Sequence, residues 1–162
     1  MGLGDNFKQC TPLGYIALIR IAVGYHFLMV ALGKLNGGFL NGKGMANQLA
    51  AGIAKDPFAW HQAFIRSQVL PNAHFFNYLT AFGELAIAIS LLVGCLVRVS
   101  SLFAAFYQAN IYLSLAVAAG GATLGLNRIF ILLHLIFFAS SAGRAIGLDG
   151  ILKKAYPRSW LF

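Results

Sequence analysis

Four ionisable side chains interrupt the long apolar runs of this sequence, and they are the residues best suited to chemistry. Glu84 is the only glutamate of the chain and stands inside the second run. Arg20 and His26 stand in the first run, and His134 stands in the last. In hydrocarbon surroundings each such group costs several kcal/mol unless it is paired or hydrated. A carboxylate near an arginine or a histidine could form an ion pair, bind a polar head group or transfer a proton.

Arg20 and Glu84 come to similar depths if the first two apolar runs form antiparallel helices. At about 1.5 Å of rise per residue, Arg20 falls roughly 4–5 Å to the inner side of the midplane and Glu84 roughly 3 Å to the outer side. An arginine side chain can cover that separation, and His26 lies near the depth of Glu84. Three alternatives follow. Arg20 and Glu84 pair and fix the helix register, they bind a polar head group such as a quinone carbonyl or move a proton, or they do not meet.

Helical spacing gives each apolar run a candidate interior face. Run by run, these faces are Arg20, Gly24, Phe27, Ala31 and Lys34; Asn77, Thr80, Glu84 and Ala88; Ser101, Gln108 and Tyr112; and Asn127, His134 and Ser141. Small residues on such faces allow helices to approach closely. We therefore predict an intramembrane polar centre or ligand-binding site made of Arg20, His26, Glu84, Gln108 and His134.

Haem and metal sites are less favoured. His26 and His134 could serve as axial ligands of a haem between helices. Such proteins carry more than two well-placed histidines, and isolated histidines in spans are more often packing residues. His61 and His74 lack a carboxylate-rich neighbourhood, so no metal site is expected there. No nucleophile elbow, P-loop, dinucleotide-binding glycine pattern or HExxH occurs, and no catalytic residue is assigned.

The composition shows what kind of element must position these residues. The chain of 162 residues is 59% hydrophobic and only 10% charged, with a mean hydropathy of +0.75. A soluble domain carries about a quarter charged residues because its surface faces water. Long unbroken apolar runs suit helices rather than the alternating strands of a barrel. The sequence therefore predicts an all-α integral membrane protein with one domain over residues 1–162.

Four apolar runs are close to the length that crosses a bilayer. They cover roughly residues 13–33, 75–97, 99–119 and 126–145, with Arg98 marking a tight hairpin between the second and the third. The loop after the first run begins with a glycine-rich turn. It then repeats apolar residues near helical spacing, which predicts an amphipathic interfacial segment broken at Pro57 and ended before Pro71. The expected fold is a four-transmembrane-helix bundle with this segment between its first two helices.

The net charge of +8 does not indicate a nucleic-acid partner, because the basic residues are spread singly and flank the apolar runs. Such residues set topology and contact anionic lipid. An even number of spans places both termini on one side, which carries slightly more basic residues in its short segments. The side with the termini carries Lys8, Arg98, Arg144, Lys153, Lys154 and Arg158. The opposite side carries Lys34, Lys43, Lys55, Arg66 and Arg128.

The positive-inside rule therefore favours a multi-pass protein of a bacterial or archaeal cytoplasmic (inner) membrane with cytoplasmic N- and C-termini. Cys10 and Cys95 would lie near the cytoplasmic face, where thiols stay reduced. The first residues lack a basic n-region, so the first apolar run is expected to remain as a span.

Several of these positions, taken in order, resemble the DoxX family, which includes the small membrane subunit of thiosulfate:quinone oxidoreductase. The resemblance covers roughly residues 15 to 152. It rests on Arg20, Gly24 and Gly33-Lys34-Leu35, on Trp60, Phe64 and Pro71-Asn72, on Gly83-Glu84-Leu85-Ala86-Ile87, on Leu91-Leu92-Val93-Gly94 and Arg98, and on the tail from Gly143-Arg144 to Asp149. It implies a four-span fold, a link to membrane redox chemistry that sometimes involves quinone, and a cytoplasmic-side motif of Arg98, Arg144 and Asp149.

The lack of a catalytic constellation favours a subunit over a self-sufficient enzyme. We expect a small membrane subunit of a larger redox or electron-transfer complex, at most the non-catalytic or quinone-side subunit of a membrane oxidoreductase. Its expected partners are membrane lipids and other membrane subunits of that complex. No cofactor motif is evident, and quinone is the cofactor that the resemblance suggests. The alternatives are a purely structural accessory subunit on the flank of a complex and a small transporter or proton pathway through Glu84.

Overall fold

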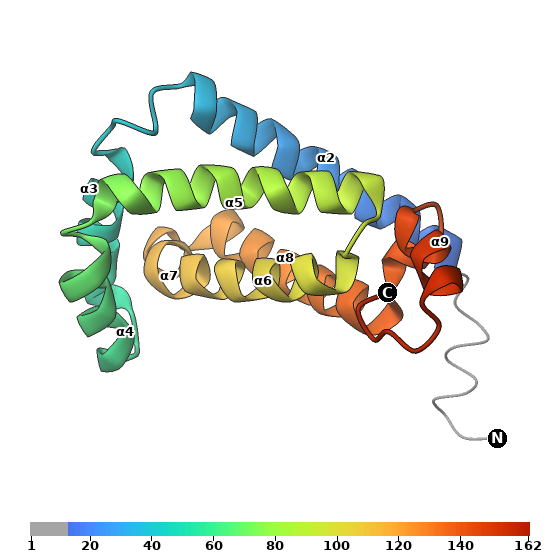
Figure 1. Ribbon diagram of the computed structural model, residues 1–162. Helices are drawn as coiled ribbons and strands as arrows, with labels where there is room; N and C mark the ends of the chain where they lie inside the picture. Colours follow the sequence, from blue (N-terminus) through green and yellow to red (C-terminus); the bar gives the residue numbers. More distant parts are fainter. Residues whose placement is uncertain (1–12) are drawn as a thin grey trace.

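The computed structural model describes residues 13–162, and every regular element within that range is a helix. The predicted all-helical fold is therefore confirmed, while Lys8 and Cys10 lie outside the described residues. The long helices are α2 (Leu13–Asn36), α5 (Ala73–Val93), α6 (Val97–Ile111) and α8 (Gly121–Ser140). They run up and down in one bundle, with shorter helices at its two ends (Figure 1).

The long helices pack as two close pairs, α2 with α5 and α6 with α8, and few contacts join α2 to α8. Close packing in the first pair depends on Gly24. A Cβ added there would lie 3.0 Å from the Cβ of Leu91 and 3.1 Å from the backbone nitrogen of Leu92. A small residue at such a crossing lets two backbones approach, so Gly24 fixes the register of α2 against α5.

Three of the described helices, α2, α5 and α8, are long and apolar enough to cross a membrane. Helix α6 continues without a break through the π-helical turn η3 (Tyr112–Ala116) into α7 (Val117–Ala119). The predicted run 99–119 is therefore helical along its whole length. That it forms a fourth span stays a prediction.

The last long helix differs in its limits from the predicted run 126–145. Helix α8 begins at Gly121 and ends at Ser140, because Ser141 has a left-handed backbone with φ of 53°. The short 3₁₀ helix η4 (Ala142–Arg144) and then α9 (Leu148–Ala155) follow. The chain thus folds back over the bundle instead of continuing along its axis.

The turn between α5 and α6 lies at the same end of the molecule. Helix α5 ends at Val93 and is capped by Gly94, whose φ of 71° is accessible to glycine at little cost. Its N–H donates to Ser90 O at 2.9 Å, and α6 begins three residues later. We call this end, with residues 13–20, 94–98 and 140–162, the terminal end; α9 and the C-terminus lie there in Figure 1.

The opposite end, residues 37–72 and 116–124, is called the loop end. It carries α3 (Gly44–Gly52), η1 (Ile53–Lys55), α4 (Ala59–Phe64) and the π-helical turn η2 (Ile65–Val69), with the break at Pro57 as predicted. In Figure 1, α3 and α4 cross the ends of the long helices. Their inward residues form a small core of Leu49, Ile53, Ile65 and Val69. The helical segment is thus present, and its place on a membrane surface stays a prediction.

Candidate functional site

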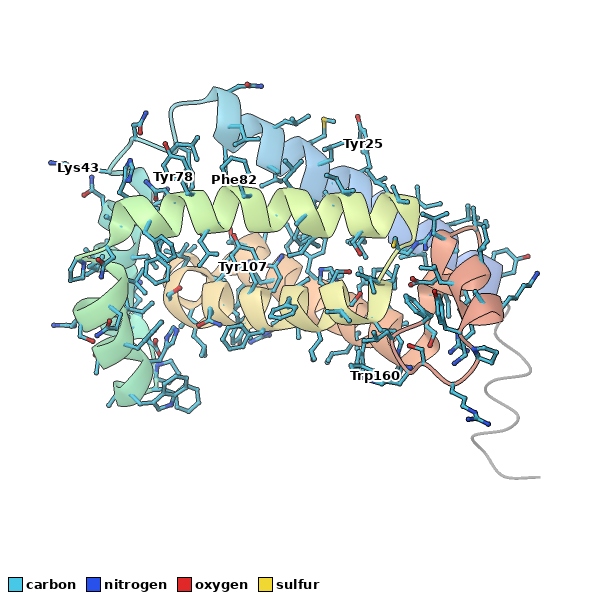
Figure 2. The ribbon with its side chains drawn as sticks, in the orientation of Figure 1. Tyr25, Lys43, Tyr78, Phe82, Tyr107 and Trp160 are labelled. Carbon is cyan, nitrogen blue, oxygen red and sulfur yellow. The ribbon has the colours of Figure 1, made fainter. Side chains whose placement is uncertain are left out.

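Glu84 lies in the middle of the bundle and is paired with Lys34. Glu84 is 4% exposed, and its Oε1 accepts hydrogen bonds from Lys34 Nζ at 2.5 Å and from Tyr107 Oη at 2.5 Å. Figure 2 shows Tyr107 between α5 and α6, so one carboxylate joins three helices, α2, α5 and α6. The lysine and the tyrosine stabilise the carboxylate in an apolar bundle by charge pairing and by a charge-assisted hydrogen bond.

A cavity of about 220 Å³ lies beside this cluster, between the two helix pairs. Its lining residues come from all four long helices: His26, Phe27, Val30, Lys34, Glu84, Gln108, Ile111, Leu126, Asn127 and Phe130. Five of these ten carry polar groups and five are apolar. Sites for small organic ligands combine apolar walls with convergent polar groups, and this lining has both.

The cavity opens at the side of the bundle. His26 on α2 and Leu126 on α8 line it and are exposed, and α2 and α8 make few contacts. The ring of His26 stacks on Phe130 with 4.9 Å between centroids. A ligand would therefore enter between α2 and α8 past an aromatic pair.

Two buried acceptor atoms of the lining residues have no hydrogen-bond partner. They are Oε2 of Glu84 and Oδ1 of Asn127, a side chain that is 7% exposed. The Nδ2 of Asn127 donates to Thr123 O at 2.9 Å, which leaves its oxygen free. Gln108, also 7% exposed, adds an amide to the same lining. Unpaired buried acceptors of this kind are rare in folded proteins.

Arg20 lies at the terminal end, away from the cavity, so the alternative in which Arg20 and Glu84 pair is wrong. Its Nη2 donates to Ile146 O at 2.7 Å and its Nη1 to Ala142 O at 3.3 Å. The guanidinium lies where a Cβ on Gly94 would be. Gly94 is ten residues beyond Glu84 on α5, which corresponds to about 15 Å along the helix axis. The contact at Gly24 sets this register and places Lys34, instead of Arg20, opposite Glu84.

His134 is fully buried and does not line the cavity. Its ring lies edge-on to Phe27, with centroids 5.3 Å apart, and edge-on to Phe137, with centroids 6.0 Å apart. Neither ring nitrogen has a hydrogen-bond partner. His134 therefore packs below the cavity floor formed by Phe27, while His26 faces the opening. Within residues 13–162 no group of three potential metal-ligating side chains comes together.

The three residues of the predicted cytoplasmic-side motif hold the terminal end together. Asp149 accepts the backbone N–H of Leu96 at 2.7 Å and of Val97 at 2.9 Å, so it caps the first turn of α6 from a distant part of the chain. Arg98 Nη1 donates to Trp160 O at 2.7 Å, and Arg144 Nη2 donates to Phe162 O at 2.5 Å. These contacts indicate a structural role for the motif.

Cys95 lies in the turn that Asp149 caps. Burial raises the pKa of the Cys95 thiol, and the negative charge of Asp149 raises this pKa further. A raised pKa leaves less of the reactive thiolate at neutral pH.

A second buried polar cluster ties the loop end to α6. His61 Nδ1 donates to Asp56 Oδ2, and His61 Nε2 lies 3.1 Å from Asn110 Oδ1. Asn110 Nδ2 donates to Phe106 O at 2.8 Å, which points its oxygen at the imidazole. Both ring nitrogens of His61 thus lie next to side-chain oxygens, which hold the imidazole between the loop end and α6. One carboxylate therefore accompanies His61 although no carboxylate-rich neighbourhood was expected.

Of the five residues predicted for the polar centre, the structure brings His26, Glu84 and Gln108 to one cavity and separates Arg20 and His134 from it. Lys34 and Asn127 also line this cavity, and Tyr107 forms a hydrogen bond with Glu84. Lys34 and Asn127 already share the interior faces of their helices with predicted residues, so helical spacing could have identified them. Tyr107 could not be found in this way, because it lies beside Gln108 in sequence and faces α5 instead of the cavity.

Comparison with known proteins gives one match. The family model described as DoxX matches residues 15–119, which include α5 and α6 with Glu84 and Tyr107. Helix α8 with Asn127 and the C-terminal segment with Asp149 lie beyond the matched residues. Neither the curated proteins nor the solved structures gave a match.

Proposed function

Because the chain belongs to the DoxX family of membrane proteins, we propose that it is a small membrane subunit of a larger redox complex that binds the polar head of a quinone between its two helix pairs. The resemblance to a family linked with membrane redox chemistry supplies the class of ligand. The cavity supplies the place. Glu84, Lys34, Gln108, Asn127 and His26 would surround the head group.

The single observation that supports this proposal most is the polar cavity with a side opening. Polar groups line a cavity of about 220 Å³ at the level of Glu84, halfway along an apolar bundle. The opening between α2 and α8 would face lipid in a membrane. A ligand that enters from the bilayer must itself be lipid-soluble and still carry polar atoms for the cavity to bind. A quinone has both properties.

The proposal includes four spans, with α6, η3 and α7 together forming the third in chain order. The terminal end would face the cytoplasm, because it carries Arg98, Arg144 and the lysines of α9. Single-cysteine variants test this orientation. In a background without Cys10 and Cys95, Lys154→Cys in inside-out vesicles should react with a membrane-impermeant maleimide, and Lys43→Cys should react in right-side-out vesicles. The opposite pattern would refute it.

The test of quinone binding uses two glutamine variants of the full chain. Gln108→Leu removes an amide from the cavity lining, and Gln48→Leu is a matched change at an exposed position on α3. Loss of one hydrogen bond worth about 1.4 kcal/mol lowers affinity about tenfold. Gln108→Leu should therefore weaken binding of a decyl-substituted benzoquinone about tenfold or more, and Gln48→Leu should not.

The subunit part of the proposal needs its own measurement. The chain is purified from its native membrane in mild detergent, and the proteins that accompany it are identified by mass spectrometry. Redox subunits in a fixed ratio are expected with the wild-type chain and with Gln108→Leu. Recovery of the chain alone would refute the subunit role and leave quinone binding to be judged by the affinity measurement.

A purely structural accessory subunit is the second candidate, and one observation favours it. Phe103 and Phe106 on α6 are 66% and 70% exposed, so they offer a large aromatic surface to a neighbouring span. In that case Phe106→Ala would reduce recovery of the complex while Gln108→Leu would leave both assembly and activity unchanged. Loss of activity in a fully assembled Gln108→Leu complex would exclude the purely structural role.

A further inference from the structure

Helix α9 is amphipathic, but its apolar side faces away from the bundle. Asp149, in its first turn, is 1% exposed and is turned inward to cap α6. Leu148, Ile151 and Ala155 are three and four residues apart, which places them on one face of the helix, and all three are exposed. An apolar surface that is left open in this way marks a site of contact with a membrane or with another protein.

Further exposed apolar residues flank the helix. Ile146 precedes α9 and is 63% exposed, and Tyr156 and Trp160 follow it and are 61% and 60% exposed. Trp160 is labelled in Figure 2, at the terminal end. Membrane proteins place tryptophan and tyrosine at the boundary between hydrocarbon and headgroups. The residues around α9 are therefore of the kind that contacts a membrane interface.

The depth of α9 follows from its contact with the end of α5. Helix α5 has 21 residues and is therefore about 31 Å long, which matches a hydrocarbon core of roughly 30 Å. When α5 spans the membrane, Gly94 directly after it lies at the boundary with the headgroups. The carbonyl oxygen of Gly94 accepts the backbone N–H of Asp149 at 2.8 Å. Helix α9 is thus held in the headgroup layer, where an outward apolar face meets lipid.

The charges around α9 indicate which lipid it meets. Asp149 is the only acidic residue in the segment that follows α8, and it is buried. Two of the basic residues there, Arg144 and Lys153, donate to backbone carbonyls and hold the C-terminal segment in place. Lys154 and Arg158 are exposed and make no such bond within the described part of the chain. Two cations without a nearby exposed carboxylate favour an anionic lipid.

A shallow hollow of about 380 Å³ directly follows α9. It is lined by Ala155, Tyr156, Pro157, Arg158 and Ser159. It thus combines apolar and aromatic groups with one guanidinium, which can bind phosphate oxygens through two parallel hydrogen bonds. The same combination fits a lipid headgroup, since the phosphate of a phospholipid is joined to apolar chains.

We propose that α9 lies in the headgroup layer with its apolar face against lipid, and that Lys154 and Arg158 bind anionic phospholipid there. This surface is separate from the cavity, so the inference goes beyond the proposed quinone site and does not depend on it. It requires only that α5 spans the membrane. A cytoplasmic terminal end agrees with it, because the cytoplasmic leaflet carries anionic lipid.

The fluorescence of Trp160 can report which lipid lies beside α9. The chain has two tryptophans, so Trp60→Phe leaves Trp160 as the reporter. The full chain is placed in phosphatidylcholine vesicles that contain an equal fraction of either brominated phosphatidylglycerol or brominated phosphatidylcholine. Bromine on the acyl chains quenches tryptophan on contact, and the dependence of quenching on lipid fraction gives the relative binding constants of the two lipids.

A basic residue near the membrane surface contributes about a fivefold preference for anionic lipid. Phosphatidylglycerol should therefore bind beside Trp160 at least about fivefold more tightly than phosphatidylcholine. Lys154→Gln combined with Arg158→Gln should bring this preference close to one. Lys43→Gln combined with Arg66→Gln removes the same charge from exposed positions at the loop end and should leave the preference unchanged.

Each outcome bears on the inference. A preference of about fivefold or more, lost in the first double variant and kept in the second, would support it. Equal quenching by both lipids would overturn it, and so would a preference that survives in Lys154→Gln with Arg158→Gln. Quenching by neither lipid would also overturn it and would indicate that water or another protein covers α9. Subtracting the signal of Trp160→Phe from that of the wild type gives the same comparison without changing Trp60.

Discussion

Replacing Arg20 by methionine should destabilise the terminal end and leave the cavity in place. The buried guanidinium makes two hydrogen bonds to backbone carbonyls, at 2.7 Å to Ile146 O and at 3.3 Å to Ala142 O. A hydrogen bond from a charged donor contributes about 1.5–3 kcal/mol, and the longer bond belongs at the lower end of that range. The two together amount to about 4 kcal/mol.

Thermal unfolding of the purified chain in detergent measures this loss. For a chain of this length, about 4 kcal/mol lowers Tm by about 10 °C. Arg20→Lys keeps the charge without the planar fork and should fall between the wild type and Arg20→Met. Arg66→Met changes an exposed arginine of η2 and is the matched control, for which Tm should stay within about 2 °C of the wild type.

A double-mutant cycle identifies the partner of Arg20. Asp149 is the acidic residue whose charge acts on Arg20, whereas Glu84 lies ten residues before Gly94, the residue that Arg20 contacts. Arg20→Met combined with Asp149→Asn should show a clear coupling energy, and Arg20→Met combined with Glu84→Gln should be additive. A fall in Tm of less than about 2 °C for Arg20→Met, or stronger coupling with Glu84 than with Asp149, would refute the reasoning.

Three further changes test other contacts. Tyr107→Phe removes the hydroxyl that donates to Glu84 and should lower the free energy of unfolding by about 1.5–3 kcal/mol, measured by chemical denaturation in mixed micelles. His61→Phe leaves the buried Asp56 carboxylate without its partner and should cost about 3–5 kcal/mol, visible as faster proteolysis of residues 44–69. Removing Asp56 as well should recover part of that loss. In a variant without the other cysteine, Cys95 should react with a maleimide more slowly than a free thiol at neutral pH and faster as the pH rises, because the raised pKa of the Cys95 thiol limits its thiolate form.

The helices and much of the cavity could be predicted from the sequence because both depend on periodicity. Apolar runs of membrane length become helices, since every backbone group must be hydrogen-bonded within the helix in hydrocarbon. Polar residues three or four positions apart on one helix share a face. The polar faces of α5, α6 and α8 turn toward the same space, so Glu84, Gln108 and Asn127 meet around one cavity.

The partner of Arg20 could not be predicted in this way. Comparing depths assumes that two helices are aligned at their midpoints. Their actual register depends on where the backbones can approach, and Gly24 allows this against the end of α5. Arg20 and Lys34 are 14 residues apart on α2, and the observed register places Lys34 beside Glu84 and Arg20 beside Gly94. The position of one glycine thus decided which of two basic residues joined the cavity.

Contacts made by turns were also missed, for a different physical reason. Asp56 and His61 are five residues apart across Pro57, a spacing that no continuous helix brings together. Ser141 ends α8 with a left-handed backbone, although serine rarely adopts it. Both depend on the surrounding fold, and only the three-dimensional arrangement shows them.

The contacts of Arg20 also bear on the order in which the protein is made. Arg20 leaves the ribosome before its acceptors on Ala142 and Ile146, which follow it by 122 and 126 residues in the chain. Until these residues have been synthesised the guanidinium has neither acceptor, so α2 must be held with this charge unpaired. A ribosome that stops before residue 142 would release a chain in which this charge has nothing to bind.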